Sequence, residues 1–100
     1  MKILWSERAQ DQVREIFEFI AEDRPLVADR ILEDLLERVQ LLAQLPKQGA
    51  AWGGPRRPDL RSIIFESYRL VYRIGAGEVA VLSVRHTRMQ PDEIRDDVEP

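Results

Sequence analysis

The side chains best suited to chemistry lie in the second half of the chain, where arginines accumulate. Residues 56–88 contain seven arginines but only three acidic side chains. The arginines are Arg56, Arg57, Arg61, Arg69, Arg73, Arg85 and Arg88. Because a guanidinium group binds a carboxylate or a phosphate through paired hydrogen bonds, several of them on one surface would recognise an acidic partner. Alternatively, each arginine pairs with a nearby acid or lies over apolar sheet surface.

His86 is the only histidine, and its side chain is the only one whose ordinary pKa lies near neutrality. In RNA cleavage such a group would move a proton at the ribose hydroxyl or the leaving oxygen, beside a cation that stabilises the phosphate. Arg69 or Arg85 is the candidate cation. A second acid–base group has no evident source, with Tyr68 and Tyr72 as the spare candidates. We therefore favour a structural role for His86, as the residue that caps a strand end.

Several other chemistries are excluded by what the sequence lacks. Without cysteine there is no disulfide and no thiolate metal site, and a single histidine makes a dedicated transition-metal site implausible. The phosphate-binding and zinc-binding motifs GxxxxGK[ST], GxGxxG and HExxH do not occur. We therefore expect neither a metal nor a cofactor. The net charge of −3 argues against a protein that grips RNA or DNA unaided, since phosphate neutralisation supplies most of that affinity.

The elements that position these residues belong to one small domain. A chain of 100 residues that is 44% hydrophobic and 33% charged is typical of a single folded domain. Its apolar runs are far shorter than the ~20 residues that a membrane span needs. Ser6, Glu7 and Arg8 put charge where a signal peptide would be apolar. We expect a cytoplasmic protein that does not act at a membrane.

The first half of the chain predicts a strand and two helices. Residues 1–5 read as a short strand, and Ser6 is a favourable helix N-cap. Apolar residues then recur at helical spacing in two stretches separated by Pro25, which suits a first helical turn. They are Ala9, Val13, Ile16, Phe17 and Ile20 in the first stretch and Ala28, Ile31, Leu32, Leu35, Leu36, Val39, Leu42 and Ala43 in the second.

The short connection between these helices predicts an antiparallel hairpin. Only Leu41 is expected to project from the far side of the second helix, as an ordinary exposed leucine or a partner contact. The first helix carries an acidic stripe opposite its apolar face, formed by Asp11, Glu15, Glu18 and Glu22. This stripe is either a solvated face or a docking surface for a basic partner.

Residues 46–59 form the one long segment without periodicity, and they contain three prolines and three glycines. Loops of this length in compact domains are often functional. Trp52, within this segment, is either a lid over one edge of the core or an exposed recognition anchor.

Three strands are predicted next, at residues 60–65, 68–74 and 79–84, with a glycine-rich hairpin turn at 75–78. In the middle strand Leu70 and Tyr72 alternate with Arg69 and Arg73. If the helices cover the apolar face, these two arginines lie on the opposite face. Arg61 and the segment Arg85–Arg88 are the candidates to join them there.

The order β-α-α-β-β-β predicts an α+β fold, with an antiparallel helical hairpin on one face of a small, largely antiparallel sheet. This single domain is expected to span residues 1–90. Residues 91–100 form an acidic tail, which we expect to be either a short frayed helix or an unanchored end.

Read together, these features resemble the ParE/RelE superfamily, the toxins of bacterial type II toxin–antitoxin modules. The likeness covers about residues 1–90. It rests on the leading strand into Ser6, the two helices, Leu45-Pro46-x-x-Gly49, Leu60-Arg61, the segment Tyr68–Ile74 and the strand ending Val84-Arg85-His86-Thr87-Arg88. The resemblance implies the same βααβββ fold and a protein that is neutralised by an antitoxin encoded beside it.

The superfamily divides by target. ParE-like members are DNA gyrase poisons, whereas RelE-like members are strongly basic, ribosome-dependent mRNA endonucleases. Arg61 and Arg69 match family arginines, and His86 matches the histidine of a Glu/Arg/His set. However, Lys47 is the only lysine after Lys2, no tyrosine follows His86, and no glutamate lies near Leu45-Pro46. These departures and the net charge of −3 favour the ParE-like branch.

The resemblance therefore implies a gyrase inhibitor that is not itself an enzyme. The alternatives are a RelE-like endonuclease using Arg69, His86 and Arg61, or a non-toxic co-repressor. The implied partners are a ParD-like or similar antitoxin in a hetero-oligomer and DNA gyrase, without sequence-specific DNA binding by the chain alone. The disordered part of the antitoxin would fold as it wraps the toxin, with an amphipathic helix in the groove beside the hairpin. The expected partner-binding residues are Arg61, Arg69, Arg73, Arg85, His86, Arg88 and Trp52.

Overall fold

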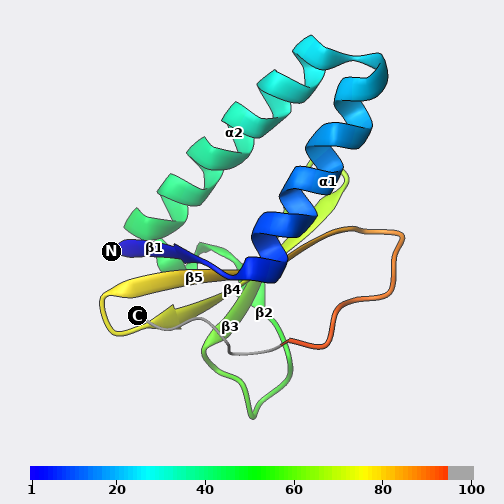
Figure 1. The fold of residues 1–100 in the computed structure, drawn as a ribbon. Helices are drawn as coiled ribbons and strands as arrows, with labels where there is room; N and C mark the ends of the chain where they lie inside the picture. Colours follow the sequence, from blue (N-terminus) through cyan, green and yellow to red (C-terminus); the bar gives the residue numbers. More distant parts are fainter. Residues whose placement is uncertain (95–100) are drawn as a thin grey trace.

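Two helices packed side by side lie over one face of a five-stranded sheet, and the far end of the helical hairpin projects beyond it (Figure 1). The computed structural model describes residues 1–94. Its elements are β1 (Lys2–Trp5), α1 (Glu7–Asp23), α2 (Pro25–Gln44), the 3-10 turn η1 (Pro46–Gln48), β2 (Ala50–Ala51), β3 (Leu60–Phe65), β4 (Tyr68–Gly75) and β5 (Glu78–His86). Over these described residues, neither helix combines the length and apolar character needed to cross a bilayer.

The strands lie in the order β1-β5-β4-β3-β2, with β1 parallel to β5 and every other pair antiparallel. The predicted α+β fold and the predicted helical hairpin are confirmed. The segment 46–59 is more ordered than we predicted, because it contains η1 and β2, which adds a fifth strand at the edge. Two-residue strands have too little periodicity to be read from sequence.

Ser6 fixes the point at which β1 ends and α1 begins. Its side-chain oxygen accepts a hydrogen bond from the Ala9 amide at 3.0 Å, which confirms the predicted N-cap. The same hydroxyl donates to the Leu82 carbonyl at 3.1 Å. The buried Ser6 hydroxyl therefore satisfies both a backbone amide in the first turn of α1 and a backbone carbonyl of β5. At the other end of α1, Arg24 alone separates the helices, and Pro25 opens α2 as predicted.

The core has a large part beneath the helices and a small part on the other face of the sheet. The large part joins β4, β5 and the two helices through residues that include Leu42, Leu70 and Tyr72. The small part consists of Leu60, Ala80 and Leu82, with Leu4, Trp52 and Ile94 packed against it. We call this second group the outer cluster. The sheet is thus apolar on both faces, although helices cover only one.

Leu36 corrects one prediction about α2. We expected only Leu41, which is 45% exposed, to project from this helix, but Leu26 is 81% exposed and Leu36 is 47% exposed. The apolar stripe of α2 is wider than the surface that α1 and the sheet cover, so its margin stays in solvent.

The Tyr72 hydroxyl anchors the turn that follows α2. It donates to the Pro46 carbonyl at 2.6 Å and accepts from the Gly49 amide at 2.9 Å. Gly49 has no room for a side chain, since a Cβ atom there would lie 2.6 Å from this hydroxyl and 2.7 Å from the Ser62 carbonyl. Burial raises the pKa of Tyr72, so the hydroxyl keeps its proton for this bond.

Replacing Tyr72 by Phe tests this anchor. We expect the free energy of unfolding to fall by about 1–3 kcal/mol, because the Gly49 amide and the Pro46 carbonyl lose their partner. Tyr68→Phe is the matched control, since the Tyr68 hydroxyl makes no hydrogen bond among the described residues. Urea unfolding of both variants measures the difference. Equal stability of the two variants would contradict the assignment.

Candidate partner-binding site

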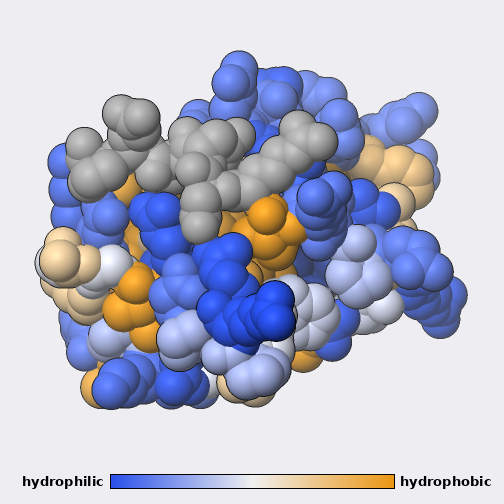
Figure 2. Space-filling view, turned by 90° about the horizontal axis from the view of Figure 1, so that it is seen from below, coloured by the Kyte–Doolittle hydropathy of each residue, from blue (hydrophilic) through white to orange (hydrophobic). Residues whose placement is uncertain are grey.

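The face of the sheet away from the helices carries the arginines of β4. Alternation along this strand turns Leu70 and Tyr72 toward the helices and Arg69 and Arg73 outward, as predicted. Figure 2 looks at the molecule from below, where blue hydrophilic side chains surround smaller orange apolar areas. We call the face of the sheet away from the helices the outer face. It consists of the outer cluster together with Arg69, Arg73 and Arg85.

A bulge in β5 decides which of its side chains join the outer face. Val71 pairs with Ser83 and Tyr72 pairs with Val81, which leaves Leu82 as an extra residue on β5. Beyond the bulge, Arg85 lies opposite Arg69 and points to the same face. The bulge therefore lets β5 present Ser83 and Arg85 outward while its earlier valines fill the core.

Arg69 lies over Trp52, its one partner among the residues that the structure describes. Its guanidinium carbon is 4.8 Å from the centre of a Trp52 ring, a cation–π arrangement. Among the residues that the structure describes, the Arg69 side chain makes no hydrogen bond or ion pair, and its buried Nε atom is unpaired. Trp52 in turn packs on the outer cluster, so it acts as a lid there and as a support for Arg69.

The neighbouring arginines are paired within the chain. Arg85 contacts Asp92 at 2.6 Å, and Arg73 contacts Glu78 at 3.4 Å. Arg57, in the loop before β3, donates two hydrogen bonds of 3.1 Å to Asp59 and holds the pKa of that carboxyl below its usual value. Arg85, Arg73 and Arg57 thus pair with nearby acids, which was one of the two possibilities that the sequence left open for the arginines.

Arg61 does not lie on the outer face, and our prediction that it would is wrong. It is opposite Tyr72 in the β3–β4 ladder, so both side chains point to the helix side. There its Nη1 atom donates to the carbonyl oxygens of Lys47 at 3.2 Å and Gly49 at 2.7 Å. Arg61 therefore caps the turn after α2, next to the bond made by Tyr72.

His86 ends β5 in the capping role that we favoured. Its Nδ1 atom accepts a hydrogen bond from the Arg88 backbone amide at 3.1 Å. Its ring packs edge-on against Tyr68, with 5.5 Å between ring centres. His86 borders the outer hollow that Arg69 lines, but in the ladder it is opposite Tyr68, whereas Arg69 is opposite Arg85. Arg69 and His86, the two residues considered for RNA cleavage, thus belong to neighbouring pairs of the β4–β5 ladder, and their side chains start from opposite faces of the sheet. The side chain of Arg88, also predicted to bind a partner, is exposed.

The segment after β5 is attached to the sheet as far as the structure describes it. The Asp92 side chain is only 9% exposed and accepts hydrogen bonds from Ser83 Oγ at 2.5 Å, Gln12 Nε2 at 2.6 Å and Arg85 Nη1 at 2.6 Å. Residues 91–94 are therefore neither helical nor unanchored, in contrast to our expectation. The rest of the tail lies outside the described residues.

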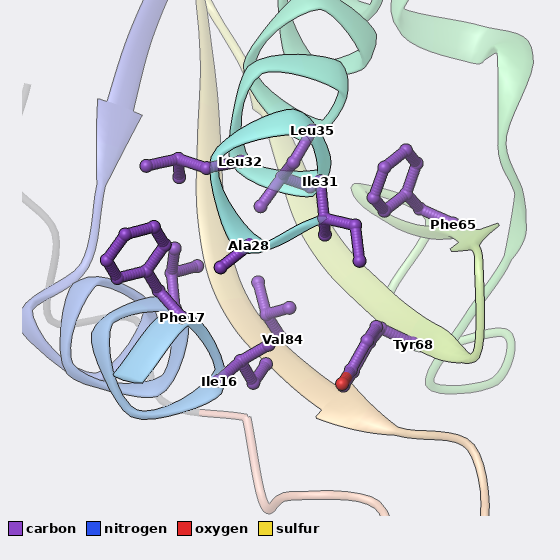
Figure 3. Close-up of a pocket in the computed structure, with 10 residues that line it drawn as sticks. Ile16, Phe17, Ala28, Ile31, Leu32, Leu35, Phe65, Tyr68 and Val84 are labelled. Atoms are coloured by element: carbon purple, nitrogen blue, oxygen red, sulfur yellow. The ribbon is translucent and has the colours of Figure 1, made fainter. Parts of the chain in front are cut away.

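An apolar groove runs between the β1 edge and both helices. It has a volume of about 610 Å³. Its lining comprises Ile3, Leu4, Trp5, Gln10, Val13, Arg14, Phe17, Leu32 and Leu36. Behind it lies a narrower crevice between the helices and the ends of β4 and β5, into which Ile16, Ile31 and Tyr68 point (Figure 3). Val13, Phe17 and Leu32 line both hollows and separate them.

No group of three or more histidine, aspartate or glutamate side chains within residues 1–94 could hold a metal ion. The outer face itself presents guanidinium, aromatic and apolar groups.

Known proteins share this sequence pattern and this fold. The sequence model described as ParE toxin of type II toxin-antitoxin system, parDE, matches residues 3–91. The structure is similar to that of a chromosomal ParDE TA system from P. aeruginosa, with a TM-score of 0.70 and 22% identity over 86% of this chain and 95% of that one. It is also similar to a YoeB/ParE toxin from Agrobacterium tumefaciens, with a TM-score of 0.59 and 22% identity over 86% and 98% of the chains. No curated protein matches the sequence.

Asp92 makes the stability of the fold depend on pH. Burial opposes its ionisation, but the hydrogen bonds from Ser83, Gln12 and Arg85 outweigh burial and hold its pKa below the usual 3.8. A lowered pKa gives stability that is complete above the unfolded value and is lost as the pH falls through the folded value. We therefore expect the free energy of unfolding to fall as the pH drops below about 4.

Asp92→Asn should lower stability at pH 7 by about 1–3 kcal/mol and flatten part of this acid dependence. The control is Asp11→Asn, which breaks only an exposed pair with Arg14 and should change stability by about 0.5 kcal/mol or less. Urea unfolding between about pH 3 and pH 7 measures both effects. An unchanged acid slope in Asp92→Asn would show that Asp92 does not carry it.

Proposed function

Because the chain belongs to the ParE toxin family of type II toxin–antitoxin systems, we propose that it acts by binding DNA gyrase and is held inactive by a ParD-like antitoxin. The outer face would contact the target, and the groove beside the helices would receive the antitoxin. The chain would then inhibit an enzyme without catalysing a reaction itself. Membership of the family supports the proposed target and the antitoxin partner. The presence of two separate surfaces supports the assignment of one surface to each of them.

The state of Arg69 is the observation that carries the proposal. Its guanidinium group rests on Trp52, while Arg85 and Arg73 are occupied by acids of the same chain. An arginine that is held in place by an aromatic ring and has no partner of its own loses little conformational entropy when it binds a carboxylate or a carbonyl group. Arginines and tryptophans of this kind are enriched among the residues that dominate protein–protein interfaces.

The outer face is better suited to a protein than to RNA. The net charge is −3, and Asp92 and Glu78 place carboxylates beside the outer arginines. Phosphate contacts in a nucleic-acid complex require an excess of cations. An endonuclease would also need a free acid–base group beside Arg69. His86 borders the hollow that Arg69 lines, but its Nδ1 atom accepts from the Arg88 amide and its ring packs against Tyr68.

Inhibition of DNA supercoiling by purified gyrase tests the proposed target. We expect the protein to inhibit supercoiling and Arg69→Ala to weaken inhibition by about tenfold or more. Arg69→Lys should lose most of the effect as well, because an ammonium group cannot form the planar stack and fork. Arg14→Ala, which removes an exposed arginine of α1, is the control.

Supercoiling that continues at a large molar excess of the protein would overturn the gyrase proposal. Overproduction in cells separates the alternatives by phenotype. Filamentation with a DNA-damage response is expected for a gyrase poison. Abrupt arrest of translation that requires His86 would indicate an mRNA endonuclease, and normal growth would indicate a co-repressor.

The groove has the shape and chemistry for an amphipathic helix of the antitoxin. Its walls are mainly apolar, and Leu36 lies exposed at its margin. Arg14 and Gln10 also line it, and they would meet the polar side of a helix that inserts its apolar residues.

Leu36→Asp and Leu41→Asp form a matched pair for testing this groove. Both leucines belong to α2 and are almost equally exposed, but only Leu36 lines the groove. We expect Leu36→Asp to weaken binding of the antitoxin by about tenfold to a hundredfold, because a charge would be buried at the contact. Leu41→Asp should leave binding unchanged. Isothermal titration calorimetry with the antitoxin encoded beside this chain measures both, and equal affinities would place the helix elsewhere.

A further inference from the structure

The segment after β5 turns back and runs along the outer face. The Met89 amide donates to the His86 carbonyl at 3.0 Å, which closes the turn at the end of the strand. In Figure 1 the chain then makes a wide loop beside α1 and turns back below the start of that helix, on the side of the sheet away from the helical hairpin. It reaches Ile94, which packs on the outer cluster. The tail therefore covers part of the surface on which Arg69 lies.

Asp92, Glu93 and Ile94 attach the tail to the domain. The side chains of Asp92 and Ile94 point to the domain and Glu93 is exposed, the alternation of an extended peptide. The Asp92 carboxylate is buried among Gln12, Ser83 and Arg85. The Glu93 carbonyl accepts a hydrogen bond from Arg8 Nη1 at 2.7 Å, and this residue is exposed. The Ile94 side chain contacts the outer cluster. The sheet thus holds an acidic residue and, two positions later, an aliphatic one.

We propose that the outer face is a docking site for an extended protein segment with the pattern acidic-x-aliphatic, and that Asp92-Glu93-Ile94 fills this site in the free protein. A partner segment with the same pattern takes the site when the tail is displaced. The inference concerns the same face as the proposed function but holds whether or not gyrase is the target.

The receptor half of this site is formed by the folded domain and not by the tail. The Gln12 amide oxygen accepts from the Val84 backbone amide at 2.8 Å, which directs its NH₂ group toward Asp92. Ser83 is turned to this face by the bulge, and Arg85 is fixed by the same strand. The Gln12 amide is therefore preorganised for a carboxylate by a contact that does not involve the tail, and β5 sets the direction of the other two donors.

The outer cluster supplies the second half of the site. Without Ile94, the cluster would lose one of the side chains that cover it. A protein surface that offers three donors for a carboxylate next to an apolar patch favours a segment that carries both groups. The hollow lined by Trp52, Arg69 and Arg85 also borders Asp92, so a partner that reaches Arg69 meets the tail.

The tail has the advantage of being tethered. A short flexible connection keeps its binding residues at an effective concentration of about millimolar at the site. A free segment at micromolar concentration therefore competes poorly with the intact tail. Weakening the tail at its two contact positions should open the site to a segment added in trans.

The test uses the full-length chain with Asp92→Asn and Ile94→Ser combined. The probe is an unlabelled synthetic peptide of residues 89–100 of this sequence, added to the ¹⁵N-labelled protein up to millimolar concentration. We expect the amide signals of Ser83 and Arg85 to shift, with half-saturation at a peptide concentration about tenfold lower than for the unsubstituted protein. A peptide that carries the same two substitutions should produce no shift.

Glu93→Gln is the matched control, because the exposed Glu93 contributes its backbone carbonyl and its side chain makes no hydrogen bond or ion pair among the described residues. This variant should bind the peptide no better than the unsubstituted protein. Ile94→Ser alone retains the Asp92 contacts and should show an intermediate gain, so it decides the matter if the double variant unfolds. The proposal would be overturned if the folded double variant and the unsubstituted protein bound the peptide equally well, or if neither bound it. Shifts confined to the groove beside the helices would overturn it as well.

Discussion

The alternation of side chains along β4 is the constraint on which the rest of the structure depends. Leu70 and Tyr72 enter the core beneath the helices, and this sends Arg69 and Arg73 to the other face. A slip of one residue would bury two guanidinium groups under the hairpin and expose two of the most buried side chains. Because that exchange is so unfavourable, the register of β4 is fixed, and with it the chemical difference between the two faces.

The register of β4 could be predicted from sequence, but the faces of its neighbours could not. β3 reads Leu-Arg-Ser-Ile-Ile-Phe, and its two adjacent isoleucines fit either phase of the alternation. Only its pairing, with Arg61 opposite Tyr72, puts Arg61 on the helix side. In β5 the continuous apolar run conceals the bulge at Leu82, which decides that Arg85 points outward. The sequence therefore shows which half of the chain carries the arginines, while strand pairing decides which of these arginines share a face.

The anchored tail illustrates a different limit of sequence reasoning. Acidic composition with few apolar residues predicts an end that stays in solvent. Asp92 is held instead by Gln12, 80 residues away in sequence, together with Ser83 and Arg85. One well-placed carboxylate, satisfied by three donors, outweighs the local composition because its partners come from the folded domain. Such a site has no signature within the segment that it binds.

The positions of the groove and the outer face limit how an antitoxin would neutralise this protein. The groove opens between the helices and the β1 edge, whereas Arg69 and Trp52 lie across the sheet. A single helix in the groove would leave Arg69 uncovered, so neutralisation by direct masking needs a segment that continues around the domain. A disordered chain that folds as it binds can wrap a large surface in this way. On that route it would meet α1, whose Gln12 holds the tail and whose next residue, Val13, lines the groove. The same helix therefore adjoins both surfaces, and an extended partner could occupy the groove and compete with the tail at once.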